Sequence, residues 1–338
     1  NDSEVIVHLM AQSKAETFLD RAAEALKQVS GAYSLVLMTK TELLAARDPH
    51  GFRPLCLGKL DGSYIVASET CVMDLIEAEF IREIEPGELI LINDQGIQSF
   101  FPFKKVETKH CVFEHIYFAR PDSFIFGEHV YTARKNMGRA MAQESPADVD
   151  IVVPVPDSGV VSAMGFAEES GIPFEMGLIR NHYVGRTFIE PQSQIRHFGV
   201  KLKLNAVKKI IAGKRVAIVD DSIVRGTTAR KIVKMLRDAG AKEIHLRISA
   251  PPILHSCFYG IDTPTKEELI AHTHNLEETR QYLAADSLAY LSLEKMMEVL
   301  ENGKKKFCSA CFDGNYPIPI TDKKTDTSQM GLFANENF

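Results

Sequence analysis

A run of apolar residues that ends in two acids most constrains the fold of this chain. Residues 215–221 read RVAIVDD, and a Gly-Thr-Thr segment follows at 226–228 before a helical pattern begins. An unbroken apolar run is typical of a strand covered on both faces, which occurs mainly in parallel sheets. Further strands of this kind are expected at 150–156 and 243–249, and amphipathic helices alternate with them at 130–144, 159–170 and 227–239. The pattern predicts an α/β fold with an open, mostly parallel sheet and helices on both faces.

The segment after the second of these strands has the features of a phosphate-binding loop. Two adjacent carboxylates stand at the carboxyl end of the strand, where open α/β sheets bind ligands, and can reach sugar hydroxyls or Mg²⁺. The loop then offers backbone N–H groups, hydroxyls and a helix N-terminus, which suit a phosphate monoester, and its glycine allows a close approach of the backbone. The alternative is a capped strand–turn–helix without a ligand. The candidate binding residues are Asp220, Asp221, Ser222, Arg225, Gly226, Thr227 and Thr228.

The string VAIVDDSIVRGTT (216–228) resembles the motif with which type I phosphoribosyltransferases bind 5-phosphoribosyl-1-pyrophosphate (PRPP). The resemblance implies that fold, and a second loop after an earlier strand that holds pyrophosphate. PVPDSG (154–159) stands in the corresponding place. The implied Mg²⁺ site, with one ion per subunit, consists of Ser158, Asp220 and Asp221.

Five further strings are similar to those of one family, the glutamine PRPP amidotransferases. They are FEHIYFARPDS (113–123), RNHYVGRTFIEP (180–191), KLKLNAV (201–207), SAPPILHSCFYGID (249–262) and CSACFDGNYP (308–317). This resemblance implies formation of 5-phosphoribosylamine from PRPP and ammonia derived from glutamine, the first committed step of purine synthesis. It also implies inhibition by purine nucleotides and a homo-oligomer, either a tetramer or a dimer.

Two basic residues are expected to complete the PRPP site. In RNHYVGRTFIEP a glycine can act as a pivot and Arg186 as a charged tip, so the segment is a candidate lid that excludes water. An ordinary basic loop is the alternative interpretation. Lys203 matches a lysine that the family places near pyrophosphate.

Residues 1–108 are predicted to be a mixed unit of helices and strands that precedes the transferase domain. Two helices are expected in residues 2–29, strands at 33–38, 63–69 and 87–94, and a turn-rich loop at 46–55. The unit resembles the later part of an N-terminal-nucleophile glutaminase domain of α+β type, in which Asp2 matches the aspartate that holds the glutamine amino group. The catalytic cysteine of that domain has no counterpart, so we identify no catalytic residue and expect the chain alone to use ammonia. Residues 109–320 form the predicted transferase domain and residues 321–338 a polar tail.

Six cysteines occur in the chain, and only one pair has the spacing of a metal motif. Cys308-x-x-Cys311 alone could be half a zinc site, a redox pair or a coincidence. In a Bacillus-like subgroup of the family, the matching strings carry the ligands of one [4Fe–4S] cluster per subunit, which implies a structural role for a cluster here. The corresponding ligands are Cys111, Cys257, Cys308 and Cys311, with a zinc ion in the same site as the alternative. Cys56 and Cys71 are interpreted as core residues.

Composition excludes several other classes of protein. Apolar residues make up 45% and charged residues 25%, as in a soluble globular protein, and the net charge of −6 argues against a nucleic-acid partner. No apolar run is long enough to cross a membrane, and the cysteine usage is that of a cytoplasmic protein. Two alternatives remain: a PRPP-binding regulator without catalysis, and a salvage phosphoribosyltransferase that uses a free purine base.

Overall fold

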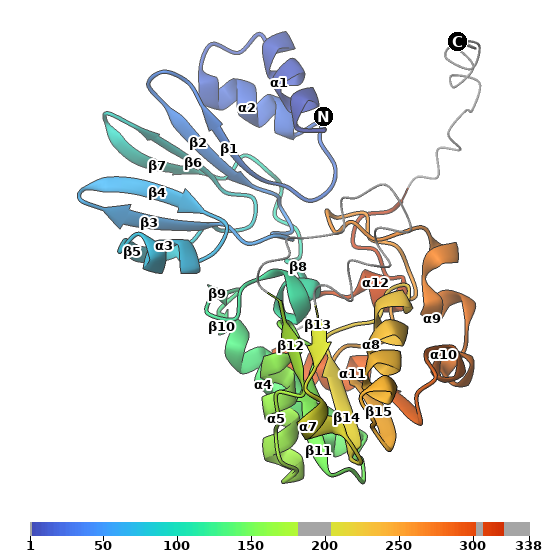
Figure 1. Ribbon diagram of the computed structural model, residues 1–338. Helices are drawn as coiled ribbons and strands as arrows, with labels where there is room; N and C mark the ends of the chain where they lie inside the picture. Colours follow the sequence, from blue (N-terminus) through green and yellow to red (C-terminus); the bar gives the residue numbers. More distant parts are fainter. Residues whose placement is uncertain (1, 182–203, 302–306, 321–338) are drawn as a thin grey trace, which may run out of the picture.

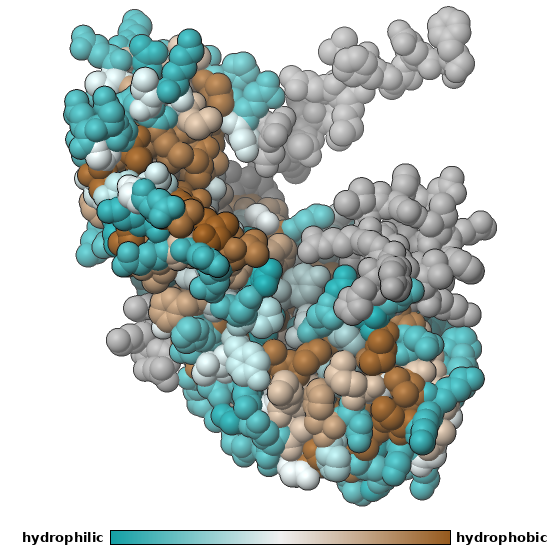
Figure 2. All heavy atoms as spheres, turned by 60° about the vertical axis from the view of Figure 1, so that its left-hand side comes forward, coloured by the Kyte–Doolittle hydropathy of each residue, from teal (hydrophilic) through white to brown (hydrophobic). Residues whose placement is uncertain are grey.

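The computed structural model describes residues 2–181, 204–301 and 307–320, apart from the side chains of Asp2 and Glu301 (Figure 1). The predictions made for Arg186, Lys203 and the tail at 321–338 lie outside the described residues. The chain forms two lobes, a first unit of helices and antiparallel sheets and a second unit built on a parallel sheet (Figures 1 and 2). Among the described residues, no helix is both long and apolar enough to cross a bilayer.

A parallel sheet forms the centre of the second unit. Its strands lie in the order β11-β14-β15-β16, and each neighbouring pair is parallel. Their bounds are β11 Ile151–Pro154, β14 Arg215–Asp220, β15 Glu243–Ile248 and β16 Ser287–Tyr290. The expected strands at 150–156, 215–221 and 243–249 are therefore confirmed. The fourth strand was not predicted, because four residues with a half-buried pattern carry little signal of their own.

Alternate residues of β14 enter two different apolar cores, one on each face of the sheet. Ala217 and Val219 pack in the core that includes α4 and α5, whereas Val216 and Ile218 pack in the core that includes α8. Figure 1 shows α4 and α5 to the left of the sheet and α8 to its right. The bounds of these helices are α4 Val130–Glu144, α5 Val160–Ser170 and α8 Thr227–Asp238. Burial of both faces explains why this strand is continuously apolar.

The first unit contains two antiparallel sheets with strand orders β1-β2-β6-β7 and β4-β3-β5. Apolar residues pack between the sheets, and the helices α1 and α2 pack with the first sheet. The bounds are α1 Asp2–Gln12, α2 Phe18–Leu26, β1 Ser34–Met38, β2 Leu43–Arg47, β3 Cys56–Leu60, β4 Ser63–Ala67, α3 Cys71–Leu75, β5 Glu79–Glu83, β6 Leu89–Asn93 and β7 Gly96–Phe100. Both expected helices and the three expected strands are confirmed. The loop expected at 46–55 is shorter, because β2 extends to Arg47.

Figure 2 shows apolar side chains gathered on the first unit, at the top of the view. Its exposed large apolar side chains include Val36, Met38, Leu75, Phe80 and Ile81. The strands β2, β3, β5 and β7 were not predicted, and each is paired with a neighbouring strand that lies elsewhere in the sequence.

Short elements connect the two units and complete the second. They are β8 His110–Cys111, the π-helix η1 Glu114–Phe118, β9 Phe124–Ile125, β10 Glu128–His129, β12 Leu178–Arg180, β13 Leu204–Ala206, α7 Lys208–Ile211, η3 Lys266–Glu268, α9 Ile270–Thr273, α10 Leu276–Leu283, α11 Leu293–Glu301, β17 Phe307–Cys308 and α12 Ala310–Asp313. In Figure 1, β9 and β10 lie between α3 of the first unit and α4 of the second.

Candidate functional site

The adjacent carboxylates stand at the end of β14. Asp220 is the last residue of the strand, and Asp221 is the first residue of the loop that follows. The Asp220 carbonyl accepts a 2.9 Å hydrogen bond from the backbone N–H of Ser249, at the end of the neighbouring strand. The backbone N–H of Asp221 donates to the Asp220 carboxylate at 2.9 Å, and the Ser222 hydroxyl donates to the Asp221 carboxylate. Both carboxylates are therefore fixed at the carboxyl edge of the sheet.

The PVPDSG loop lies against the same edge, because β11 and β14 are parallel neighbours. Gly159 makes this approach possible: a Cβ atom there would stand 2.4 Å from the Val219 carbonyl oxygen and 3.2 Å from the Asp220 Cα. The Ser158 hydroxyl acts on the Asp221 carboxylate and lowers its pKa. The structure thus brings together Ser158, Asp220 and Asp221, as the sequence predicted for a magnesium site.

The electrostatics of the pair favour a bound cation. Burial and the charge of Asp221 raise the pKa of Asp220 well above its usual value. Burial also raises the pKa of Asp221, although hydroxyls of Ser158 and Ser222 and the charge of Arg134 oppose that rise. Two buried carboxylates repel each other unless a cation neutralises them, and oxygen ligands of this type suit Mg²⁺. The side chains present therefore fit the magnesium ion that the fold implies.

The loop after the carboxylates leads into α8 through a left-handed glycine. Gly226 has φ +72°, and a Cβ there would stand 2.7 Å from the Ile270 Cδ1, so both conformation and space favour glycine. Thr227 and Thr228 begin the helix and are exposed. Within the described residues no side chain caps this helix, so its first N–H groups and the two hydroxyls are available to an anion. Arg225 is exposed and forms an ion pair with Glu268, with Nε 2.7 Å from Oε2.

Arg186 and Lys203 lie outside the described residues. Asp2 is the first residue of α1, and its side chain is not described. Near the start of the lid sequence, Arg180 forms an ion pair with Asp157 of the PVPDSG loop.

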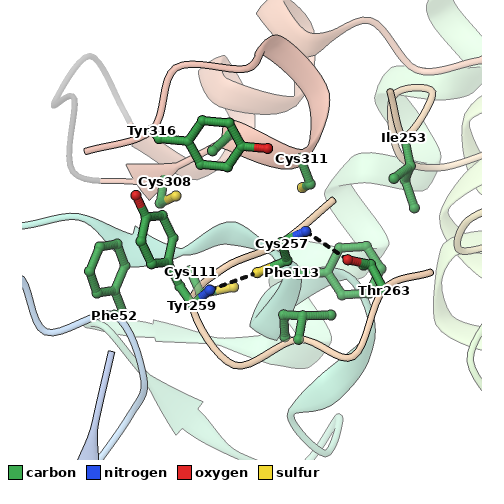
Figure 3. Close-up of a pocket in the computed structure, with 12 residues that line it drawn as sticks. Phe52, Cys111, Phe113, Ile253, Cys257, Tyr259, Thr263, Cys308, Cys311 and Tyr316 are labelled. Atoms are coloured by element: carbon green, nitrogen blue, oxygen red, sulfur yellow. Dashed lines mark hydrogen bonds between the residues drawn. The ribbon is translucent and has the colours of Figure 1, made fainter. Parts of the chain in front are cut away.

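The four predicted cluster ligands line one pocket, which is shown in Figure 3. Cys111 and Cys308 are partners in the parallel pairing of β8 with β17, and Cys311 follows on α12. The loop that carries Cys257 is tied to α12, because backbone N–H groups of residues 254 and 255 donate to the Cys311 carbonyl at 2.9 and 3.0 Å. Three segments that are far apart in sequence thus present their thiols to a common space. Apolar and aromatic residues complete the wall, among them Phe52, Phe113, Ile253, Tyr259 and Tyr316.

Cys111 is buried, and the other three thiols of this pocket are partly buried. Burial raises the pKa of Cys111 and Cys311, and the neighbouring thiols raise both further, so the thiolates need positive charge beside them. The backbone N–H of Tyr259 donates to the Cys257 sulfur at 3.3 Å, as in sites that hold thiolate ligands. In the described part of the chain, no three His, Cys, Asp or Glu side chains are grouped to hold a metal ion. A zinc ion needs its sulfurs about 2.3 Å from one centre, whereas an iron–sulfur cubane spreads four thiolates over four irons.

Cys56 and Cys71 are buried in the first unit, as expected for core residues.

A buried arginine near the carboxylates was missed in the sequence. Arg134 is only 3% exposed and lies on the inner face of α4 with Val130, Met137 and Met141. The signal was present, because a charged residue at the i+4 position of an otherwise apolar helix face requires a buried partner. A cavity lined by polar and apolar residues of both units was also not predicted. Its lining includes Ser34, Arg53, Glu69 and Glu114.

Comparisons with known proteins agree with this two-unit architecture. A family model described as a glutamine amidotransferase domain matches residues 1–74, and one described as a phosphoribosyl transferase domain matches residues 131–252. The chain is 52% identical to amidophosphoribosyltransferase 1, chloroplastic, of Arabidopsis thaliana, over 99% of the chain and 61% of that protein. It is 50% identical to the amidophosphoribosyltransferase of Bacillus subtilis, over 95% of the chain and 68% of that protein.

Solved structures give the same result in three dimensions. The structure described as glutamine PRPP amidotransferase from B. subtilis complexed with ADP and GMP matches with a TM-score of 0.89 at 49% identity. The match covers 96% of this chain and 72% of that one. Another, described as the allosteric regulatory enzyme of purine biosynthesis, also has a TM-score of 0.89 and covers 95% of this chain and 70% of that one. The chain spans 56–61% of the length of three chloroplastic relatives, from Arabidopsis thaliana and Glycine max.

Proposed function

The chain belongs to the amidophosphoribosyltransferase family, and from that premise we propose that it transfers the phosphoribosyl group of PRPP to ammonia. The nitrogen of ammonia forms a bond to C1 of the ribose while the bond from C1 to pyrophosphate breaks, and one proton leaves to solvent. The products are 5-phosphoribosylamine and pyrophosphate, which makes this the first committed step of purine synthesis. One observation supports the proposal most strongly. The Asp220–Asp221 pair and the loop with Ser158 lie together at the carboxyl edge of the parallel sheet.

The proposed division of roles follows from the chemistry of each group. Ser158, Asp220 and Asp221 would hold Mg²⁺, which when bound neutralises the pyrophosphate leaving group. The segment from Ser222 to Thr228 would hold the 5-phosphate with its backbone N–H groups and hydroxyls, while the carboxylates also reach the ribose hydroxyls. Arg186 is proposed to close over the substrate and exclude water, and Lys203 to contact pyrophosphate.

The cysteine pocket is proposed to hold one [4Fe–4S] cluster per subunit, with Cys111, Cys257, Cys308 and Cys311 as its ligands. Such a cluster would tie β8, the loop at 254–257 and α12 together. Its role would be structural. Four thiolates around zinc are the alternative.

The first unit is proposed to belong to a glutaminase domain in which Asp2 holds the amino group of glutamine. We propose domain boundaries at residues 108 and 320. Inhibition by purine nucleotides and a homo-oligomeric state, either a tetramer or a dimer, are further proposals that rest on family membership. A cytoplasmic location is proposed from the cysteine usage. The complex with ADP and GMP is a finding about the B. subtilis protein.

Pyrophosphate release from PRPP distinguishes the proposed enzyme from its alternatives. With Mg²⁺ and ammonium chloride, we expect release, and we expect none with adenine, guanine or hypoxanthine. Release with a purine base would instead identify a salvage transferase, and binding of PRPP without release would identify a regulator.

Asp221→Asn tests the site itself and should abolish transfer and weaken PRPP–Mg²⁺ binding. The matched control is Asp150→Asn, because that partly exposed aspartate pairs with Arg215 at the opposite end of β14. A wild-type rate in Asp221→Asn would contradict the assignment of the site.

A further inference from the structure

Arg134 interacts both with a proposed ligand of the PRPP site, Asp221, and with a segment that is hydrogen-bonded to the first unit. Its Nε donates to the carbonyl of His115 at 2.7 Å, and its Nη2 donates to the carbonyl of Ala119 at 2.8 Å. These carbonyls lie at and just after the π-helix η1, where a cation stabilises unpaired backbone acceptors. One buried charge therefore fixes the start of residues 119–126, which run from η1 to β9 and the turn after it.

Side chains of the first unit accept hydrogen bonds from the same segment, residues 119–126. The Glu69 carboxylate accepts 2.8 Å hydrogen bonds from the backbone N–H of Arg120 and from the hydroxyl of Ser123. The Thr70 hydroxyl accepts from the backbone N–H of residue 124 at 2.8 Å, and a Glu83 carboxylate oxygen accepts from that of residue 126 at 2.7 Å. Because these contacts join loops across the two units, the position of residues 119–126 depends on how the first unit is docked.

The segment is also joined to the helix that carries Arg134. Backbone N–H groups of residues 130 and 131, at the start of α4, donate to the carbonyls of Ser123 and Pro121 at 3.0 and 2.9 Å. One turn later α4 crosses α5, where the Ser162 hydroxyl donates to the Arg134 carbonyl at 3.2 Å. The helix α5 begins directly after the Ser158 loop. A shift of residues 119–126 therefore reaches the carboxylate site through both backbone and side chain.

The charge of Arg134 acts on Asp221. Burial lowers the pKa of the guanidinium, and the carboxylates that oppose this effect are, in order of size, Asp221, Glu69 and Glu114. Asp221 is 6% exposed and Arg134 3%, so water screens their attraction weakly. Arg134 is thus attracted both to Asp221, a proposed magnesium ligand, and to Glu69, which accepts hydrogen bonds from residues 119–126.

We propose that Arg134 is a positioning residue. Through it, the hydrogen bonds between Glu69 and residues 119–126 set the affinity of the carboxylate site for PRPP and Mg²⁺. The inference rests on the proposed function, because it concerns the same site. It predicts an energetic coupling between two side chains of different units, neither of which needs to touch the substrate.

A double-mutant cycle measures this coupling. PRPP binding is measured by calorimetry with Mg²⁺ for the wild type, Glu69→Ala, Arg134→Lys and the double variant. We expect each single change to weaken binding about tenfold, a typical size for coupled contacts, and the double variant to bind about as weakly as either alone. Independent effects that multiply in the double variant, or wild-type affinity in either single variant, would overturn the inference.

Matched controls separate positioning from loss of packing. Arg247→Lys alters another buried arginine that donates to backbone carbonyls, at residues 145 and 146, and whose pKa burial alone lowers. Glu88→Gln alters a buried carboxylate that bonds only within the first unit, to Arg82 and Ser99 among other groups. We expect both to lower the melting temperature and leave PRPP affinity unchanged. Equal losses of affinity in these controls would refute a specific role for Arg134.

A charge series gives a second readout. At fixed PRPP, the Mg²⁺ concentration at half-saturation should differ between Arg134→Gln and Arg134→Lys, because only lysine keeps a positive charge that acts on Asp221. The same value for both would overturn the electrostatic part of the inference. If the Arg134 variants do not fold, Ser123→Ala still removes one hydrogen-bond donor to Glu69. Wild-type PRPP affinity in both single variants, Ser123→Ala and Glu69→Ala, would then overturn the inference. Absence of PRPP binding in the wild type would instead refute the proposed function.

Discussion

Replacing Gly159 with alanine tests whether the close approach of two backbones builds the carboxylate site. The added Cβ would stand 2.4 Å from the Val219 carbonyl oxygen, 2.9 Å from that of Val155 and 3.2 Å from the Asp220 Cα. All three are backbone atoms, and two of them belong to β14, which is packed on both faces. The loop must therefore move, since the strand cannot.

The size of the effect follows from these distances. To lengthen the 2.4 Å contact to an ordinary one, the loop must retreat by about 1 Å, which carries Ser158 away from Asp221. Overpacking of this kind costs about 1–3 kcal/mol of folding stability. A misplacement of about 1 Å at a reacting centre lowers the rate about a hundredfold. We therefore expect kcat to fall by two orders of magnitude while the protein still folds.

The assay is pyrophosphate release with ammonium as the nitrogen donor, alongside thermal unfolding. Gly177→Ala is the matched control, because a Cβ at Gly177 would meet only the ends of the Ile211 and Val153 side chains, at 2.7 and 2.9 Å. The control should lose stability and keep its kcat. The reasoning is refuted if Gly159→Ala keeps a wild-type kcat, or if both variants lose activity in proportion to stability.

Three further predictions concern other parts of the molecule. Cys308→Ser should remove one of the four thiols of the pocket, so anaerobically isolated protein should lose bound iron and sulfide and its broad visible absorbance. The control Cys56→Ser should keep all three. Four sulfurs around zinc by metal analysis would contradict the cluster. Gly226→Ala should lower stability by about 1–2 kcal/mol and weaken PRPP binding, because φ +72° and the Ile270 side chain both disfavour a Cβ; unchanged urea midpoints would contradict the argument. Burial raises the pKa of Asp48 from 3.8 to about 6 in the folded protein, so its contribution to stability is present below pH 3.8 and is lost as the pH rises to about 6. The unfolding free energy of the wild type relative to Asp48→Asn should fall by roughly 3 kcal/mol across that interval, measured by urea denaturation, and parallel pH profiles would refute it.

The sequence determined the parallel sheet and the place of its binding loop, because both are encoded locally. Residues 216–219 are apolar on both faces of the strand, and a sheet covered on both sides satisfies such a run. The acids and the glycine that follow mark the end of the strand and the start of a helix within a few residues. Short strands such as β16 and β3 escaped prediction because their stability comes from partners elsewhere in the chain.

Contacts between distant segments were decided only by the tertiary structure. The four cysteines face one space because β8 pairs with β17 and backbone N–H groups at residues 254 and 255 bond to α12, and no local pattern encodes that pairing. The electrostatic influence of Arg134 on Asp221, and the hydrogen bonds of Glu69 to residues 120 and 123, likewise depend on how α4 packs on α5 and how the two units dock. A single sequence specifies which charged groups are present and their local order. Which partners a buried charged side chain contacts is decided by the tertiary packing that removes water from around it.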